Sequence, residues 1–164
     1  MKRLFAIFLG VLFLASCDSE HEGYVISGSI KGEPENGTMV FLKTTDSVNQ
    51  LVDVDTATVE NGLFSFNGSQ DEPKMHYLFV DKVRGNAPII VENGIIDVEF
   101  QKDSIGFAKV KGTEQNELFM DFLTESRILS DRARSMQNDM RTAAQQRDTA
   151  TVAALREEFM EFQE

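Results

Sequence analysis

The sequence of 164 residues predicts an α+β fold: an antiparallel β-sandwich or open barrel, followed by a C-terminal helical hairpin. Between residues 24 and 112, short segments of alternating apolar and polar residues are separated by turn residues, with no helical segment between them. After Gly112 the apolar spacing changes to three and four residues, and neither Gly nor Pro occurs again. Strands at short intervals without crossover helices favour antiparallel pairing, and the change of period marks the beginning of the helices.

Eight strands are expected in the first part of the chain, because each segment alternates or is rich in β-branched and aromatic residues. They are residues 24–30, 38–43, 51–59, 63–66, 76–80, 87–91, 95–100 and 107–111. Asn-Gly pairs stand at residues 61–62, 67–68 and 93–94, and a further pair at 36–37 lies in the turn that Gly32 and Pro34 also mark. The pair at residues 61–62 predicts a β-hairpin, since both central residues of a type I′ turn need positive φ.

Two amphipathic helices are expected between residues 113 and 164. Thr113 is the expected N-cap of the first helix, and Asp148 or Thr149 that of the second. The apolar residues of the two helices form a stripe along one side. Such a stripe must be buried against another surface, and this sequence need not contain the whole of that surface. The stripe consists of Leu118, Phe122, Leu129, Ala133, Met136 and Met140 in the first helix, and Val152, Leu155, Phe159 and Phe162 in the second.

The N-terminus has the pattern of a secretory signal, with Lys2 and Arg3 before an apolar run from Leu4 to Ala15. The run is shorter than the ~20 residues that span a bilayer as a helix. Leu14-Ala15-Ser16-Cys17 resembles the bacterial lipobox, in which the cysteine becomes the N-terminus and carries lipid. We therefore expect lipid anchoring at Cys17 to the outer membrane of the cell envelope, on its periplasmic or surface face. The alternative is an ordinary signal peptide with a chance cysteine.

The expected organisation is a lipoprotein signal peptide (1–17), a polar tether (18–23), a β domain (24–112) and an amphipathic helical segment (113–164). Removing the signal leaves 147 residues and changes the net charge from −11 to −13, because it takes away two basic and no acidic residues. Such a charge argues against nucleic acid or an anionic membrane surface as a partner, since both attract basic patches.

No catalytic, cofactor-binding or metal site is predicted. Cys17 is the only cysteine, which excludes an intrachain disulfide, a CxxC redox pair and a cysteine zinc site. The two histidines, His21 and His76, are too far apart in sequence for ligand spacing. Asp53 and Asp55 are expected on one face of a strand, where solvated side chains explain them better than an acid–base pair.

Four Asp-Ser/Thr-aliphatic triplets resemble the O-glycosylation site of Bacteroidota envelope proteins. The acceptor hydroxyls would be those of Ser47, Thr56, Ser104 and Thr149. A glycan needs an exposed segment, so Ser47 and Ser104, in expected loops, are the better candidates. Thr56 lies within an expected strand, and the triplet at Thr149 is also explained as a helix cap.

The β segment as a whole resembles the DUF4369 domain, over roughly residues 24–125. This domain is found at the N-terminus of Bacteroidota envelope lipoproteins, where a helical segment and a thioredoxin-like domain often follow. The resemblance implies an accessory or substrate-positioning domain. The residues that carry it are 27–32, 37–42, 55–68, the Val91-Glu92-Asn93-Gly94 turn and the segment Val110-Lys111-Gly112-Thr113-Glu114-Gln115-Asn116.

This chain departs from the redox members of that group, whose chemistry resides in a CxxC pair or a peroxidatic cysteine. No cysteine follows Cys17, so the chain itself cannot exchange disulfides. We expect a non-catalytic N-terminal module associated with a thioredoxin-like thiol-disulfide oxidoreductase, without a cofactor. The alternative is a stand-alone binding or structural lipoprotein that recognises a protein or a glycan. Expected partners are the membrane, through lipid at Cys17, and a thioredoxin-like domain or envelope protein.

Overall fold

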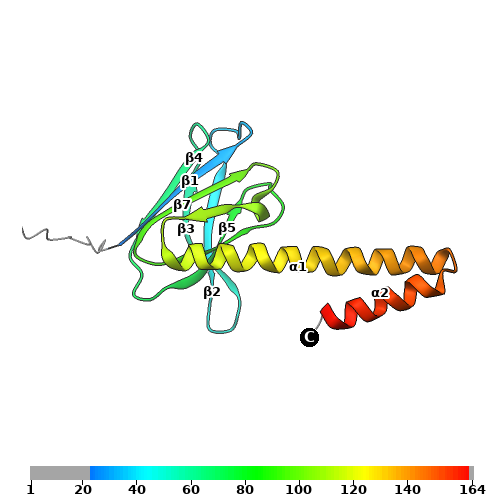
Figure 1. The fold of residues 1–164 in the computed structure, drawn as a ribbon. Helices are drawn as coiled ribbons and strands as arrows, with labels where there is room; N and C mark the ends of the chain where they lie inside the picture. The colour runs from blue at the N-terminus through cyan, green and yellow to red at the C-terminus, as the bar shows by residue number, and fades with distance from the viewer. Residues whose placement is uncertain (1–22, 163–164) are drawn as a thin grey trace, which may run out of the picture.

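The computed structural model describes residues 23–162, which form two packed β-sheets and a helical hairpin (Figure 1). The expected signal peptide, Cys17 and His21 lie outside these residues. The fold class is confirmed as an open, sandwich-like arrangement rather than a closed barrel. Its elements are β1 (Tyr24–Lys31), β2 (Met39–Thr45), β3 (Leu51–Thr58), β4 (Leu63–Gly68), β5 (Lys74–Val80), β6 (Ala87–Val91), β7 (Gly94–Gln101), η1 (Ile105–Phe107), β8 (Lys109–Lys111), α1 (Glu114–Gln145) and α2 (Thr149–Phe162).

The first sheet has the strand order β4-β1-β7-β8, and the second has the order β3-β2-β5-β6. Five of the six pairings are antiparallel, but β1 and β7 run parallel, with Tyr24 opposite Gly94 and Lys31 opposite Gln101. The sequence predicted antiparallel strands throughout. Turn residues identify strands that follow each other in the chain, and they carry no information about how β1 pairs with the distant β7.

Asn-Gly pairs occur in segments that carry the chain from one sheet to the other. Asn61 and Gly62 have φ values of 52° and 77°, and Glu60 and Leu63 on either side exchange two backbone hydrogen bonds of 2.9 Å. The tight turn is therefore confirmed, but the strands it joins, β3 and β4, belong to different sheets. The turn at Asn93 likewise lies between β6 of the second sheet and β7 of the first.

The core lies between the sheets and consists of the inward-facing residues of the alternating strands. Phe64 lies over Gly28, its partner in the β1–β4 pairing, and occupies the space that a side chain at residue 28 would fill. Tyr24 covers Gly68 at the other end of the same pairing. Such aromatic–glycine pairs fix the strand register. The fully buried apolar side chains include Ile26, Val40, Leu42, Val59, Phe66, Leu78, Ile89, Val91, Ile96, Val98 and Ile105.

A β-bulge separates the two aspartates that were expected on one face of β3. Leu42 lies opposite Asp55, and the next residue, Lys43, lies opposite Asp53, so Val54 is the additional residue on β3. Asp53 pairs with the outward-facing Lys43 at 2.7 Å, whereas Asp55 lies opposite the buried Leu42. The expectation of a shared face was wrong, because an inserted residue changes the alternation.

The first turns of α1 close the side of the sandwich at β6 and β8, which are the edge strands that α1 contacts. Asn116 is fully buried there, and its Oδ1 accepts a hydrogen bond from the N–H of Ile90 in β6 at 2.9 Å. Its Nδ2 donates to the carbonyl of Ile90 at 2.6 Å and to Oγ1 of Thr113 at 2.8 Å. Thr113 stands at the N-cap position, but its hydroxyl makes no hydrogen bond to the helix backbone.

The helical hairpin projects from the sandwich, and α2 folds back along the C-terminal half of α1 (Figure 1). Asp148 caps α2 by accepting hydrogen bonds from the N–H and the hydroxyl of Thr151, at 3.0 and 2.7 Å. The predicted stripe is buried only in part: Met136 is buried, and Ala133 and Met140 are partly buried. Its N-terminal residues Leu118, Phe122 and Leu129 are 58, 63 and 54 % exposed, because α2 has 14 residues and α1 has 32.

Candidate functional site

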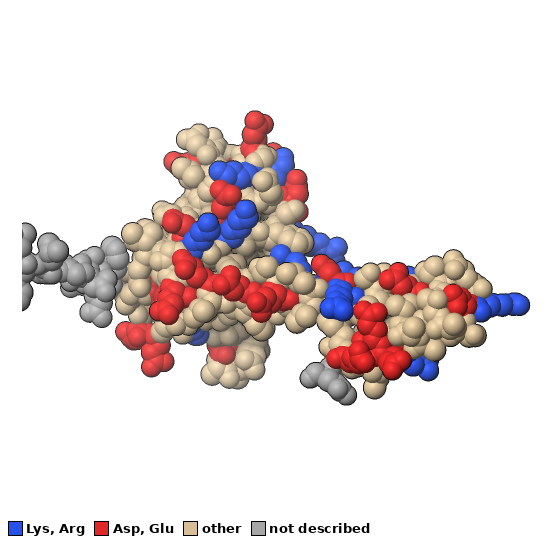
Figure 2. Space-filling model, in the orientation of Figure 1, with Lys and Arg blue, Asp and Glu red and all other residues tan. Residues whose placement is uncertain are grey.

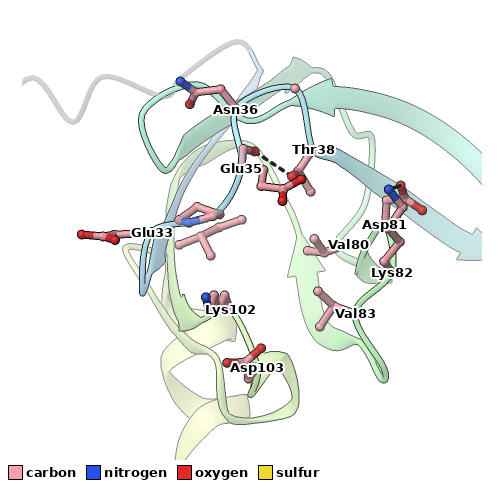
Figure 3. Close-up of a pocket in the computed structure, with 13 residues that line it drawn as sticks. Glu33, Glu35, Asn36, Thr38, Val80, Asp81, Lys82, Val83, Lys102 and Asp103 are labelled. Atoms are coloured by element: carbon pink, nitrogen blue, oxygen red, sulfur yellow. Dashed lines mark hydrogen bonds and ion pairs between the residues drawn. The ribbon is translucent and has the colours of Figure 1, made fainter.

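A pocket of about 380 Å³ lies at one end of the sandwich, between three loops (Figure 3). They are the β1–β2 loop, the loop after β5 and the segment that follows β7. Val80 and Val83 are directed into the pocket, and Glu33 is directed away from it (Figure 3). The lining residues are Ile30, Glu33, Pro34, Glu35, Asn36, Gly37, Thr38, Val80, Asp81, Lys82, Val83, Lys102 and Asp103.

The backbone around the pocket is held in a fixed shape. Glu33 and Lys82 have φ values of 55° and 61°. This left-handed conformation is higher in free energy for any residue that has a side chain. Hydrogen bonds hold the β1–β2 loop: Oγ1 of Thr38 donates to the carbonyl of Glu35 at 2.7 Å, and Oδ1 of Asn36 accepts from the N–H of Asn61 at 2.7 Å. These two hydrogen bonds hold the loop that forms one wall of the pocket.

The lining combines charged side chains with an apolar floor. Four carboxylates and two ammonium groups surround an apolar floor, a mixture that suits a small polar or zwitterionic ligand. Thr38 carries the one hydroxyl of the lining, and it donates to a backbone carbonyl. Cysteine, serine and histidine do not occur among the lining residues.

The four predicted glycosylation acceptors are exposed and lie on separate segments. Ser47 is in the β2–β3 turn, Thr56 is on the edge strand β3, Ser104 precedes η1 and Thr149 begins α2. Of the four, Ser104 lies next to the pocket, since its neighbour Asp103 is a lining residue. Exposure is a requirement for a glycan, and modification of these hydroxyls stays a prediction.

Three of the four aspartates in these triplets have a local structural role. Oδ1 of Asp46 accepts hydrogen bonds from the N–H groups of Val48 and Gln50, both at 2.9 Å. Asp55 accepts from the N–H of Thr56 at 2.7 Å, and Asp148 caps α2. Turn and cap formation therefore explains part of the Asp-Ser/Thr pattern without a modification.

His76 is a core residue of β5, with 3 % of its surface exposed and its Nδ1 2.9 Å from the carbonyl oxygen of Lys74. Burial lowers the pKa of its imidazole, and the charge of Lys74 adds to this, while the hydrogen bond to the Lys74 carbonyl opposes it. Across residues 23–162, no group of three or more His, Cys, Asp or Glu side chains is arranged to hold a metal ion.

The sequence analysis missed a second surface, on the outer face of the second sheet. Phe41, Tyr77 and Phe79 are partly exposed there, and Nζ of Lys43 lies 5.4 and 5.6 Å from the ring centroids of Phe41 and Phe79. The signal in the sequence was the aromatic pair at alternate positions 77 and 79. These partly exposed rings lie beside the ammonium group of Lys43 and its paired carboxylate, Asp53. Such a combination would suit a glycan or a peptide.

The part of the chain that the structure describes contains no helix with the length and apolar character needed to cross a membrane. A comparison with curated proteins finds no match. The family model described as a domain of unknown function, DUF4369, matches residues 24–119. The match spans β1 to β8 and the first turns of α1, where Asn116 bonds the edge of β6. Since the match covers more than half of the chain, the protein belongs to the DUF4369 family.

Proposed function

We propose that this protein is a lipid-anchored accessory module of the bacterial cell envelope, associated as a non-catalytic N-terminal domain with a thioredoxin-like thiol-disulfide oxidoreductase. Membership of the DUF4369 family and the lipobox pattern at Cys17 support this proposal. The observation that carries it furthest is the long helical arm, which contacts the sandwich through its first turns and then leaves it (Figure 1).

The arm is suited to holding a partner at a distance from the sandwich. A helix of 32 residues is about 48 Å long at a rise of 1.5 Å per residue. Asn116 fixes its beginning to β6 through two hydrogen bonds, so its direction is set by the β domain. With the lipid at one end of the chain and the hairpin at the other, the module would position its partner relative to the membrane.

The partner domain would carry out disulfide exchange, because the nucleophile of that reaction is a cysteine thiolate. This chain has Cys17 alone, and a lipidated cysteine carries a thioether instead of a thiol. The role of the chain would then be to hold the redox domain and help to present its substrate.

Anchoring is tested by labelling the protein with a radioactive fatty acid in a bacterial host. We expect label in the wild-type membrane fraction and none in a Cys17→Ala variant. A Ser19→Ala variant serves as the control and keeps the label. Incorporation of lipid that survives the Cys17→Ala change would contradict the proposal.

The non-catalytic role is tested by insulin reduction in the presence of dithiothreitol. The purified chain without residues 1–17 is expected to leave the rate at that of dithiothreitol alone. Acceleration by the pure chain would overturn the assignment of the redox chemistry to a partner.

A second candidate function is that of a stand-alone lipoprotein that recognises a glycan or protein through the outer face of the second sheet. The partly exposed Phe41, Tyr77 and Phe79 favour it, since flat rings stack on sugar faces. Binding on a glycan array that a Tyr77→Ala variant loses, and a Tyr77→Phe variant keeps, would support this second function.

A further inference from the structure

An apolar stripe on the N-terminal half of α1 continues the face that α2 covers. Leu118, Phe122 and Leu129 are spaced by four and seven residues, so they lie on one side of the helix. Met136 lies 18 residues, or five full turns, after Leu118, and it is buried where α2 packs. The exposed residues therefore belong to the same side of α1 as the α1–α2 interface.

Helix α2 covers this side of α1 only as far as Arg132. Arg132 pairs with Glu158 of α2 at 3.3 Å, and its guanidinium lies 5.3 Å from the ring centroid of Phe162, the last described residue. From Glu114 to Leu129 no described residue of α2 is available to cover the stripe. This stretch is about 24 Å long, which is close to the length of α2 itself.

The sandwich does not cover the stripe either, because it binds the opposite side of α1. Asn116, which bonds β6, and Met120, which packs against the core, are separated by one helical turn. Each is about half a turn of rotation from Leu118 at 100° per residue. The stripe therefore faces away from the β domain, and the domain leaves room for another helix there.

A row of acidic residues flanks the stripe: Glu114, Glu117, Asp121 and Glu125, spaced by three, four and four residues. Within residues 23–162, none of these four carboxylates forms an ion pair, and the neighbouring Arg132 is already bound to Glu158. Acidic side chains gather along the lower edge of the β domain toward the hairpin (Figure 2). A partner with Lys or Arg beside its apolar face would complement this row.

We propose that the N-terminal half of α1 is a docking site for an amphipathic helix with a basic flank, which lies antiparallel to α1 and in line with α2. Continuity with the α1–α2 interface gives the apolar face and the direction. An antiparallel partner also brings its C-terminus to Glu114 and Glu117, and cations are favoured at helix C-termini. A second copy of this chain or an anionic membrane would instead bring negative charge against the acidic row.

The proposal is tested with two helix-stabilised peptides of about 16 residues, which share one Leu/Ile face and differ in having Lys/Arg or Glu on the flanks. Fluorescence anisotropy measures their binding to the chain without residues 1–17. We expect the basic peptide to bind at least tenfold more tightly than the acidic one, and raising the salt concentration from 50 to 300 mM to reduce this preference.

Substitutions of exposed residues test where the peptide binds and are not expected to unfold the protein. Phe122→Ser is expected to weaken binding of the basic peptide at least tenfold, and Glu117→Gln combined with Asp121→Asn to remove most of its advantage over the acidic peptide. Met160→Ser is the matched control, because Met160 is 61 % exposed on α2 and outside the stripe. If circular dichroism shows that Phe122→Ser unfolds the chain, Leu118→Ser takes its place.

Three outcomes would overturn the proposal. Equal binding of both peptides would show a non-specific apolar surface. A dimer in sedimentation that the Phe122→Ser change dissolves would assign the stripe to a second copy. Binding to vesicles of anionic lipid that the same change abolishes would assign it to a membrane. The proposal does not depend on Cys17 or on a redox partner, so its failure leaves the proposed function standing.

Discussion

At the scale of single residues, Asn116 joins the two parts of the molecule. Its amide satisfies both backbone groups of Ile90 on the edge of β6, where a further strand would otherwise pair. The resemblance of residues 110–116 to the DUF4369 family includes this residue, but no rule of helix capping predicts a side chain that completes a sheet. The role of Asn116 depends on the contact between β6 and α1, which are distant in the sequence.

Replacing Asn116 by Ala should destabilise the protein by about 1–3 kcal/mol, because it leaves the buried N–H and carbonyl of Ile90 without partners. Urea unfolding monitored by circular dichroism measures this change. Gln115→Ala is the matched control, since Gln115 is exposed, and should change the free energy of unfolding by less than about 0.5 kcal/mol. An Asn116→Ala variant as stable as the control would show that the amide is not needed at this junction.

His76 should make the stability fall as the pH is lowered from neutral. Burial lowers the pKa of His76 in the folded protein, so the unfolded chain takes up a proton first, near its ordinary value of about 6.5. Stability is complete above that pH and is lost as the pH falls toward the folded pKa. The urea midpoint of the wild type should therefore decrease more between pH 7.5 and 5.5 than that of a His76→Leu variant. Parallel curves for the two proteins would contradict this.

At the scale of elements, the sequence predicted each of the eight strands and both α-helices of residues 23–162, because alternation, turn residues and helical spacing are local properties. It did not predict the short helix η1, whose last residue, Phe107, was expected in the final strand. It did not predict the parallel pairing of β1 with β7, the change of sheet at Asn61-Gly62 or the bulge at Val54, since each depends on contacts between distant segments. The pocket escaped prediction for the same reason: its three loops come from residues around 35, 82 and 102.

The end of α1 is formed by Arg147 in the left-handed conformation, with φ of 59°, where glycine is usual. An Arg147→Gly variant should therefore stabilise the hairpin by about 0.5–1 kcal/mol, after allowing for the greater freedom of glycine in the unfolded chain. Amide hydrogen exchange in α2 should become about twofold to fivefold slower. Arg147→Ala removes the same side chain but keeps a Cβ in the left-handed conformation, so it should leave the exchange rate in α2 unchanged. Equal protection in the two variants would argue against strain at this residue.

Asp148 makes the stability of the helical hairpin depend on pH in the acidic range. The N–H of Thr151, followed by its hydroxyl, lowers the pKa of the Asp148 carboxyl by hydrogen bonding to its charged form. The cap is therefore complete above the ordinary pKa of an aspartate and is lost as the pH falls through the lower folded pKa. Helix content measured by circular dichroism should decline over that acidic range more in the wild type than in an Asp148→Asn variant. An identical decline in both would assign the acid sensitivity to other carboxyls.

At the scale of the whole molecule, a β-sandwich carries a projecting helical arm (Figure 1). In the proposed function, lipid at Cys17 tethers the chain to the membrane. The pocket at the end of the sandwich suits a small ligand, while the arm suits a partner of larger size. These two surfaces lie on different elements, so binding at one need not obstruct the other.

The measurement that tests the central claim most directly is the mass of the native protein in the membrane fraction of its source. An antibody raised against residues 24–111 would detect it on a denaturing gel. The account predicts a band larger, by one thioredoxin-like domain of about 100–150 residues, than the mature chain that begins at Cys17. A band at the size of the mature chain, with no larger species, would contradict the module and favour the stand-alone binding protein.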